Sequence, residues 1–418
     1  MKKQGAGRKQ VAGKAQAKSR KRQTTRRRAQ AAQSQRLAPE RGKPPVGKVR
    51  VGILFGGKSG EHEISLLSAQ SVMRAINKDK YDIVPIGITP EGRWLTGGDP
   101  LKALTGGQVT MPELLQAPLA PHSAAQVGRA LIPGAGQSGI PSVDVIFPVL
   151  HGPMGEDGTV QGLFELADLP YVGAGVMASA VGMDKVAMKD VFRAHGLPLV
   201  PYLVFLRGEW ERNPTEVMAQ IEARLGFPCF IKPANLGSSV GITKAHDHAE
   251  LDAALADAAS YDRKLLAEMA VPHVREIECS VLGNDDPIAS LPGEVKPGRE
   301  FYDYEAKYFD KNTQLIVPAP ISDELTAHVR DLAIRAFRAV DCAGMARVDF
   351  ILDGETNELF LSEINTIPGF TSVSMYPRLW QATGMSYEEL IDRLIDLALE
   401  RHADKKRNRT AQPVEDGE

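Results

Sequence analysis

Cysteine is scarce in this sequence, and long apolar runs are absent. The three cysteines among 418 residues are Cys229, Cys279 and Cys342. Their spacing does not match a metal-ligand pattern, and isolated thiols in apolar segments are typical of buried structural cysteines in a reducing compartment. No apolar stretch approaches the roughly 20 residues that a membrane-spanning helix needs. We therefore expect a cytoplasmic protein that has no disulfide framework and no membrane contact.

Acidic residues are nearly missing from the first 50 positions, which hold 17 Lys and Arg and the single acid Glu40. The remainder carries 33 basic and 51 acidic residues, a net charge of −18. Residues 1–47 also contain almost no large apolar side chains, so we expect a disordered basic tail. A solvated extension without a dedicated role is favoured for this tail. Contact with nucleic acid or another polyanion, or a role as a transit peptide, remains open.

The remaining chain has the composition of a soluble globular protein, with 43% hydrophobic and 24% charged residues. Its length exceeds one ordinary core and predicts two or three domains. Strands are predicted at 49–55, 81–88 and 143–149, and a helix follows the first strand through Ala75. This alternation predicts a doubly wound α/β domain that binds its ligands at the carboxyl ends of the strands. Residues 101–141, rich in Gly, Pro, Ala and Gln, indicate a variable insertion.

A functional P-loop is excluded, although Gly52-x4-Gly57-Lys58-Ser59 matches the P-loop pattern formally. The intervening residues include three bulky apolar side chains, which fill a core and cannot form a flexible phosphate loop. The glycine turn after this strand still leaves backbone N–H groups free at a helix N-terminus, an arrangement that favours anions. His151 follows another predicted strand on a glycine-rich loop, where it is a candidate for substrate contact or a residue that caps the loop.

A hairpin is predicted over residues 345–365. Residues 345–352 and 358–365 alternate between apolar and polar side chains as strands do, and 353–357 have the composition of a connecting loop. Side chains two residues apart in a strand share a face. The hairpin therefore gathers its alternate polar side chains on one face.

Centring this hairpin on Thr356 places Asp349 opposite Glu363 and Arg347 opposite Asn365. Three oxygen ligands then share one face with a cation beside them. Oxygen ligands suit a hard ion such as Mg²⁺, which binds jointly to phosphate oxygens. On the pattern alone, a solvated hairpin face explains these residues equally well.

Two lysines indicate a phosphate site. Lys185 follows Asp184, a suitable N-cap, and lies at the positive end of a predicted helix. Lys232 lies in an apolar strand and needs an anionic partner, because an unpaired buried ammonium is costly. Triphosphate oxygens would supply this partner, and the small-residue loop 234–241, including the Ser238 hydroxyl, would close over them.

Taken together, eight motifs in order resemble the D-alanine–D-alanine ligases of the ATP-grasp superfamily. They are GGKSGEHEIS (56–65), HGPMGEDGTVQG (151–162), GAGVMASAVGMDK (173–185), IKPANLGSSVG (231–241), REIECSVLGN (275–284), FYDYEAKY (301–308), GMARVDF (344–350) and EINTIPGFTSVSMYP (363–377). The resemblance extends from about Val49 to Arg401. It implies an α/β chain in which an N-terminal doubly wound parallel sheet domain (48–180) precedes an α+β ATP-grasp fold. That fold has a central subdomain (181–275) and a C-terminal subdomain (276–403), and a disordered tail (404–418) would end the chain.

The resemblance also implies that ATP and two Mg²⁺ (or Mn²⁺) ions bind between the ATP-grasp subdomains. By motif position, the ATP-binding residues would be Lys185, Lys232 and Lys307 at the phosphates, Ser239 in the loop, Glu268, Met269, Ala270 and Val271 at the adenine edge, and Glu276 at the ribose. The metal ligands would be Asp349, Glu363 and Asn365, with Glu363 bridging both ions.

The same resemblance assigns the amino-acid subsites. Glu61 would hold the ammonium of the first D-alanine, and Ser238 and Tyr308 would hydrogen-bond with Glu61 and anchor a lid. The remaining assignments are Arg347 and the Gly369 N–H at the oxyanion, Ser374 and Met375 at the second D-alanine, and His151 beside the first.

The implied activity is ATP-dependent synthesis of D-alanyl-D-alanine through an acyl phosphate, for cell-wall precursors, by an enzyme that is usually a homodimer. Tyr308 favours amide over ester formation, because related depsipeptide ligases have Phe at this position. Selectivity among D-alanine, D-serine and D-lactate depends on the shape of the pocket. Alternatives are another ATP-grasp carboxylate–amine ligase, such as a different dipeptide ligase, or a polyanion-binding protein whose function lies in the tail.

Overall fold

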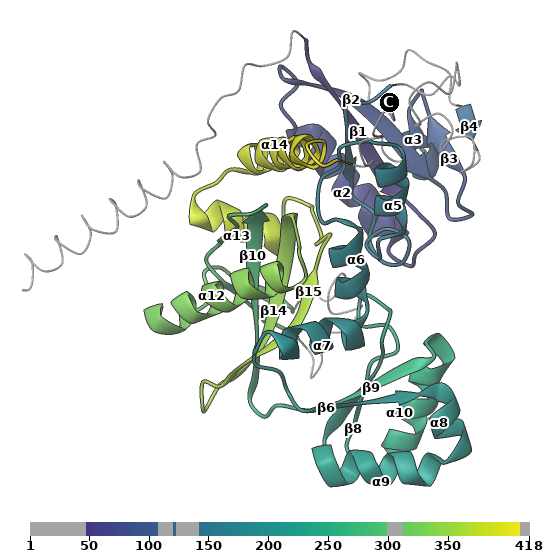
Figure 1. The fold of residues 1–418 in the computed structure, drawn as a ribbon, viewed down its shortest axis with the longest axis vertical. Coiled ribbons are helices and arrows are strands. Elements are labelled where there is room, and N and C mark those ends of the chain that lie inside the picture. Colours follow the sequence, from purple (N-terminus) through teal and green to yellow (C-terminus); the bar gives the residue numbers. More distant parts are fainter. Residues whose placement is uncertain (1–46, 108–119, 123–141, 299–311, 410–418) are drawn as a thin grey trace, which may run out of the picture. The chain divides into compact units, whose positions relative to one another are not determined.

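A computed structural model describes residues 47–107, 120–122, 142–298 and 312–409 (Figure 1). The chain divides into two units between residues 47 and 48, and the described helices and strands belong to the second, residues 48–418. The predicted basic tail and most of the predicted insertion lie outside the described residues. The predicted C-terminal tail begins too early at 404, because helix α14 (Tyr387–Lys405) continues to Lys405.

The first sheet has the strand order β4-β3-β2-β1-β5. Strand β1 (Val49–Gly56) lies between β2 (Tyr81–Ile88) and β5 (Val145–Pro148) and runs parallel to both, which confirms the predicted parallel core. The short strands β3 (Trp94–Thr96) and β4 (Ala120–His122) extend the sheet in antiparallel pairing. Gly52 lies inside β1, so the formal P-loop match begins within a buried strand and cannot form a phosphate loop there.

Five helices are described in the part of the chain that contains this sheet and in the segment that follows it. Helix α2 (His62–Ala75) follows β1 and ends at the predicted residue. The remaining helices of this part are α3 (Pro100–Leu104), α5 (Thr159–Leu166), α6 (Val176–Met183) and α7 (Lys185–Ala194).

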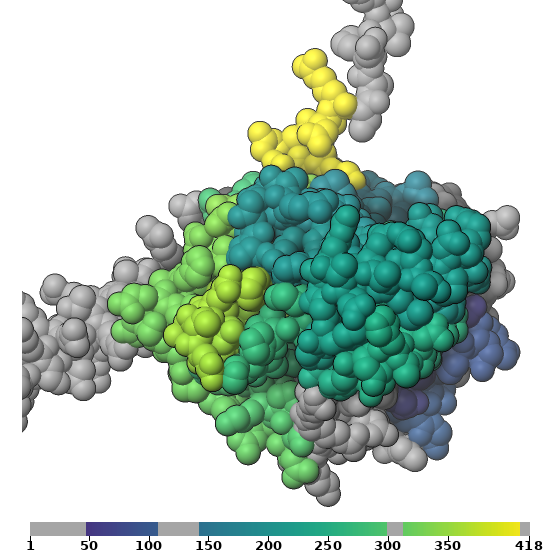
Figure 2. Space-filling model, turned by 90° about the horizontal axis from the view of Figure 1, so that it is seen from below, coloured from purple at the N-terminus to yellow at the C-terminus, as the bar shows by residue number. Residues whose placement is uncertain are grey.

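The second sheet is antiparallel, with the order β6-β9-β7-β8. Its strands are β6 (Tyr202–Leu206), β7 (Cys229–Pro233), β8 (Thr243–Ala245) and β9 (Lys264–Met269), and its helices are α8 (Arg207–Arg212), α9 (Pro214–Leu225) and α10 (His248–Tyr261). Apolar side chains of the sheet and of α9 and α10 form a core of their own. In Figure 2 the atoms of this segment, in teal, form one continuous block.

The third sheet has the order β13-β12-β10-β14-β15, with β11 paired to β10, and its described pairs are all antiparallel. Its strands are β10 (Val274–Gly283), β11 (Ile288–Ala289), β12 (Gly293–Lys296), β13 (Gln314–Ile316), β14 (Gly344–Asp353) and β15 (Leu359–Asn365). Helix α12 (Asp323–Ala339) contacts β10, β14 and β15, and helix α13 (Met375–Thr383) precedes α14.

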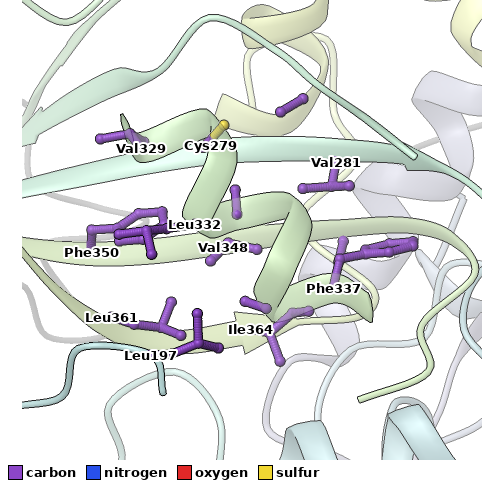
Figure 3. Close-up of a cluster of buried hydrophobic side chains, with 14 of the residues drawn as sticks. Leu197, Cys279, Val281, Val329, Leu332, Phe337, Val348, Phe350, Leu361 and Ile364 are labelled. Atoms are coloured by element: carbon purple, nitrogen blue, oxygen red, sulfur yellow. The ribbon is translucent and has the colours of Figure 1, made fainter. Parts of the chain in front are cut away.

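The sequence of α12 explains its position on this sheet. Ser322 caps its N-terminus by accepting a hydrogen bond from the N–H of Leu325. Two acids in the first turn interact favourably with the positive end of the helix dipole. Its buried residues recur at intervals of three and four, as expected for a helix with one apolar face. Figure 3 shows Leu332 and Phe337 of α12 against Val348 and Phe350 of β14 in this core.

The hairpin of β14 and β15 has the predicted register at the four polar residues: Arg347 pairs with Asn365, and Asp349 with Glu363. The alternation along β15 is nevertheless interrupted, because the register shifts after Asp349 and Ser362 has no direct partner. Leu359 and Leu361 are buried in the core. A strictly alternating strand would also turn Glu363 into the core, so the bulge directs this carboxylate to the opposite face.

All three cysteines are free and buried, as expected of structural thiols. Burial raises the pKa of the Cys229 thiol to about 11, and those of Cys279 and Cys342 to about 12. These values leave the thiols protonated at neutral pH. Among the described helices, none has the length and apolar character needed to cross a membrane.

Candidate active site

A cavity of about 690 Å³ gathers side chains from all three sheet-containing parts of the second unit. Eleven of the predicted site residues line it: Glu61, His151, Lys185, Ser238, Ser239, Arg347, Glu363, Asn365, Gly369, Ser374 and Met375. Lys232, Glu268, Met269, Ala270, Val271, Glu276 and Asp349 are not among its lining residues. Lys307 and Tyr308 lie outside the described residues.

Glu61 and Ser238 meet across the cavity although 177 positions separate them in the sequence. Glu61 is the N-cap residue of α2, and Ser238 lies in the small-residue loop with φ of 51°. The Ser238 hydroxyl donates a hydrogen bond to the Glu61 carboxylate, as predicted. Ser59 strengthens this corner by donating to the carbonyl of His151 over 2.6 Å. The small-residue loop therefore contacts the first sheet-containing part at the end of its glycine turn.

His151 is buried and links two distant segments. Its Nδ1 lies 3.0 Å from the carbonyl oxygen of Ile367, and its Nε2 lies 3.1 Å from the hydroxyl of Ser68. Burial lowers the pKa of His151, which favours the neutral ring. Because a carbonyl only accepts, we assign the proton to Nδ1, and Nε2 then accepts from Ser68. His151 thus fixes the segment after β15 against helix α2.

Glu156 is a site residue that the motif GEDG contained but sequence reasoning did not single out. It is buried, lines the cavity and accepts a hydrogen bond of 3.0 Å from the N–H of Gly152. A Cβ atom at Gly237 would lie 3.3 Å from an oxygen of Glu61 and 3.5 Å from an oxygen of Glu156. Burial, with the nearby charge of Glu61, raises the pKa of Glu156 to about 8.

Three acids stand in a row across the third sheet. Glu278 of β10 pairs with Asp349 of β14, which in turn pairs with Glu363 of β15. Arg347 compensates this charge: it donates to both oxygens of Asp349 over 2.7 and 2.6 Å, and its Nε lies 3.1 Å from Glu278. Glu278 was missed as a site residue. Its sequence signal was a carboxylate at alternate positions of an otherwise apolar strand.

The donor set of Asp349, Glu363 and Asn365 fits a hard divalent cation. All its donor atoms are oxygens, and like charges opposite each other in a sheet are destabilising unless a cation offsets them. Both oxygens of Asp349 face Arg347, but each carboxylate oxygen can accept more than one partner. The Asn365 side-chain oxygen accepts from the N–H of Ile367 over 3.0 Å. No group of three or more His, Cys, Asp or Glu that could hold a metal ion occurs in the described ranges.

Lys185 is directed toward this face by the start of α7. Asp184 caps the helix as predicted, accepting from the N–H groups of Val186 and Ala187 over 3.1 Å. The Lys185 ammonium donates to the carbonyl of Leu236 over 2.7 Å and lies 3.9 Å from Glu363. The first turn of α7 therefore places a cation between the small-residue loop and the acids.

The residues predicted to contact the adenine lie at the end of strand β9 in the second sheet and directly after it. Glu268 and Met269 close β9, and Ala270 and Val271 follow it. Glu268 forms ion pairs with Lys232, for which the sequence had predicted a phosphate partner, and with Lys189, which the sequence had not singled out. Lys189 lies one helical turn after Lys185, close in sequence to the apolar Met188 and Phe192. In the sequence this spacing is that of an ordinary helical residue, so it did not indicate a functional role for Lys189. Glu276 lies within β10, opposite Val295 and Ile351.

The segment after β15 forms the far wall of the cavity. Ser374 is the N-cap residue of α13, and its hydroxyl accepts from the N–H of Thr371 over 3.1 Å. Met375 packs with Val295 and Leu379. A Cβ atom at Gly369 would lie 3.2 Å from the Ser374 hydroxyl, so a larger residue at 369 would crowd this corner.

A parallel α/β sheet followed by two antiparallel sheets, with the small-residue loop and the acidic hairpin facing one cavity, defines an enzyme of the ATP-grasp class. Sequence models of the D-ala D-ala ligase N-terminus and C-terminus match residues 50–174 and 191–396. The chain therefore belongs to the D-alanine–D-alanine ligase family.

Individual relatives agree with this assignment. The D-alanine–D-alanine ligase of Heliobacterium modesticaldum is 51% identical over 368 residues, which cover 87% of this chain and 98% of that protein. The ligase of Geobacillus thermodenitrificans is 50% identical over 364 residues, covering 86% and 98%.

Solved structures show the same similarity. The VanG D-Ala:D-Ser ligase from Enterococcus faecalis has a TM-score of 0.73 at 37% identity, covering 84% of this chain and 100% of that one. The D-alanine–D-alanine ligase from Coxiella burnetii has a TM-score of 0.70 at 36% identity, covering 86% and 98%.

Proposed function

We propose that this chain joins two D-alanine molecules into D-alanyl-D-alanine at the expense of ATP, for cell-wall precursor synthesis in the cytoplasm. The observation that carries the proposal is the hydrogen bond from Ser238 to Glu61 in the cavity that Arg347 and Glu363 also line. It joins the residues assigned to amino-acid binding with those assigned to phosphoryl transfer.

The first step is a phosphoryl transfer. A carboxylate oxygen of the first D-alanine, whose ammonium Glu61 holds, attacks the γ-phosphorus of ATP, and the bond to ADP breaks. An acyl phosphate results. Lys185, Lys232 and Lys307 offset the charge that moves between the oxygens, because phosphoryl transfer depends on positioning and electrostatic stabilisation.

The second step forms the amide. The neutral amine of the second D-alanine attacks the acyl carbon, phosphate leaves, and the nitrogen loses a proton. Arg347 and the N–H of Gly369 stabilise the oxyanion, while Ser374 and Met375 orient the second amino acid. His151, held neutral by burial, lies beside the first. Tyr308, together with Ser238 and Glu61, would hold a lid that excludes water from the acyl phosphate.

Asp349, Glu363 and Asn365 would hold two Mg²⁺ or Mn²⁺ ions. Such ions supply charge neutralisation and orientation of phosphate oxygens. The acids are already brought together by the sheet register, so the protein does not need to rearrange its backbone to bind the ions. The functional unit we propose is a homodimer.

The test is a phosphate-release assay on the purified chain with ATP, MgCl₂ and D-alanine, D-serine or D-lactate as acceptor, with the product identified by mass spectrometry. We expect D-alanyl-D-alanine as the main product and little release with L-alanine. Glu61→Gln should lose most activity, whereas Glu63→Gln, at an exposed position on the same helix, should retain it. A mixed product as the main species would support a different dipeptide or depsipeptide ligase. No ATP-dependent product with any acceptor would contradict the proposal.

A further inference from the structure

A buried cluster of three charged side chains lies at the junction of α7 with the second sheet. It consists of Lys189, Glu268 and Lys232, and Lys189 and Glu268 are only 2% and 3% exposed. The Lys189 Nζ lies 2.5 Å from Oε1 of Glu268. Lys232 pairs with the other oxygen, Oε2. One carboxylate therefore holds two ammonium groups.

This cluster carries one positive charge in excess. Burial alone would raise the pKa of Glu268, but the two ammonium groups outweigh burial and lower it to about 2. The carboxylate is therefore ionised at neutral pH. Because excess charge away from water is costly, a further anionic group beside the cluster is favoured. A nucleotide phosphate is such a group under the proposed function.

The two lysines differ in their access to a ligand. The Lys232 side chain is 14% exposed and precedes the small-residue loop, whereas the Lys189 side chain is 2% exposed. The Lys189 ammonium lies 5.5 Å from the centroid of the Tyr202 ring. Its ion pair lacks hydrogen-bond geometry, and its Nζ has no other hydrogen-bond partner among the described residues. Lys189 can therefore neutralise Glu268 but is too enclosed to reach a ligand.

We propose that Lys189 is a positioning residue for nucleotide binding: it keeps Glu268 paired, so that the Lys232 ammonium can turn from Glu268 to a phosphate. This inference rests on the proposed ATP site. Without Lys189, movement of Lys232 would leave a buried carboxylate without a counterion. Lys232 would then remain on Glu268, and the phosphate would lose its partner.

The test compares Lys189→Met with the wild-type chain by calorimetric titration with ADP and Mg²⁺ and by steady-state kinetics. We expect the Kd for ADP and the KM for ATP to rise at least about 10-fold, since breaking a buried ion pair is strongly unfavourable. The KM for D-alanine should change less than about 2-fold. A residue that merely stabilises the core would lower Tm and leave the affinity for ADP unchanged, and this result would overturn the proposal.

Three further variants separate charge from packing. Lys189→Arg keeps the charge and should restore much of the affinity for ADP. Arg193→Met removes a mostly exposed cation on the same helix, 5.5 Å from the same Tyr202 ring, and should have no effect. The double variant Lys189→Met/Glu268→Gln also removes the carboxylate that would be left without a counterion when Lys232 moves.

The double variant also decides the matter if Lys189→Met does not fold. The proposal expects it to bind ADP within about 3-fold of the single variant Glu268→Gln, which lacks the same adenine-side carboxylate. A folded double variant that binds ADP much more weakly than Glu268→Gln would overturn the proposal. A wild-type chain that binds ADP but ligates nothing would contradict the proposed function, while the comparison of ADP affinities would still decide the role of Lys189.

Discussion

At the scale of single residues, the cavity concentrates carboxyl groups that must differ in protonation. Four glutamates line it: Glu61, Glu156, Glu278 and Glu363. Glu278 and Glu363 have cations nearby, in Arg347 and Lys185. Glu156 is instead buried and adjoins the negative Glu61, and both effects raise its pKa, to about 8. This division leaves Glu61 as the carboxylate suited to hold a substrate ammonium.

The raised pKa of Glu156 predicts a specific dependence of stability on pH. Between its ordinary pKa of 4.5 and about 8 the folded chain binds a proton that the unfolded chain has released. The contribution of this group is therefore fully present below pH 4.5 and is lost as the pH rises toward 8, at most by about 1.4 kcal/mol per pH unit.

Glu156→Gln tests this dependence because the amide can still accept from the Gly152 N–H but cannot ionise. The free energy of unfolding of both chains should be measured in urea at intervals from pH 5 to 8.5. We expect the variant to gain stability relative to wild type as the pH rises. Parallel pH curves for the two chains would show that Glu156 does not titrate in this range.

A second prediction at this scale concerns the metal-facing acids. Asp349→Asn and Glu363→Gln each remove a charged oxygen ligand while keeping side-chain size. We expect ATP-dependent phosphate release to fall at least about 100-fold in each variant. Removing a residue that only supports a metal ligand already costs up to about 100-fold, so loss of a ligand itself should cost at least as much. The assay should use D-alanine and saturating Mg²⁺. Normal turnover in both variants would refute the metal assignment.

At the scale of elements, the bulge at Ser362 determines where the β15 carboxylate points. On the loop side of the bulge, Phe350 pairs with Leu361, whereas on the other side Asp349 pairs with Glu363. The extra residue converts a strand whose odd-numbered side chains face the core into one whose Glu363 faces the cavity. Bulges near active sites often redirect a side chain in this way.

Deletion of Ser362 is expected to leave activity largely intact. Without the extra residue, Leu361 and Glu363 become neighbours on opposite faces of a regular strand, and the pairs Phe350–Leu361 and Asp349–Glu363 are both kept. Phosphate release and Tm should both be measured. Ser362→Ala, which keeps the bulge, is the matched control and should remain active. A deletion variant without activity at an unchanged Tm would show that Ser362 takes part in the regular alternation and that no bulge directs Glu363.

At the scale of the whole molecule, the described elements and the family match lie beyond the basic tail. The match begins at residue 50, and the first strand begins at Val49. We expect removal of residues 1–47 to leave kcat and KM within about 2-fold and Tm within about 2 °C, because no predicted site residue lies in this segment. The kinetics and Tm of both chains provide the measurement. Loss of ligation in the truncated chain would assign the tail a role in catalysis or folding.

Much of the site was predictable from local pattern. The hairpin register placed Asp349 opposite Glu363 correctly, and Asp184 was correctly predicted as the cap that precedes Lys185. The sequence also singled out the small-residue loop, whose Gly237, Ser238 and Ser239 line the cavity. The division into domains at 181 and 276 and the roles of the site residues remain predictions.

Other features depended on contacts between segments far apart in the chain. Lys189 and Glu278 have the spacing of ordinary helix and strand residues, and only their burial beside opposite charges distinguishes them. The raised pKa of Glu156 likewise follows from its burial and its proximity to Glu61. Such proximity has no signal in a single sequence.

The sequence by itself determined the strands, the helix caps, the family and the kinds of atoms available for chemistry, because these follow from local periodicity, capping and motif order. The tertiary structure alone decided which charges neutralise each other and that a bulge at Ser362 lets Leu361 stay buried while Glu363 faces the cavity. The physical reason is that a carboxylate's pKa and orientation depend on the groups packed around it, and the fold brings those groups together from all three sheets.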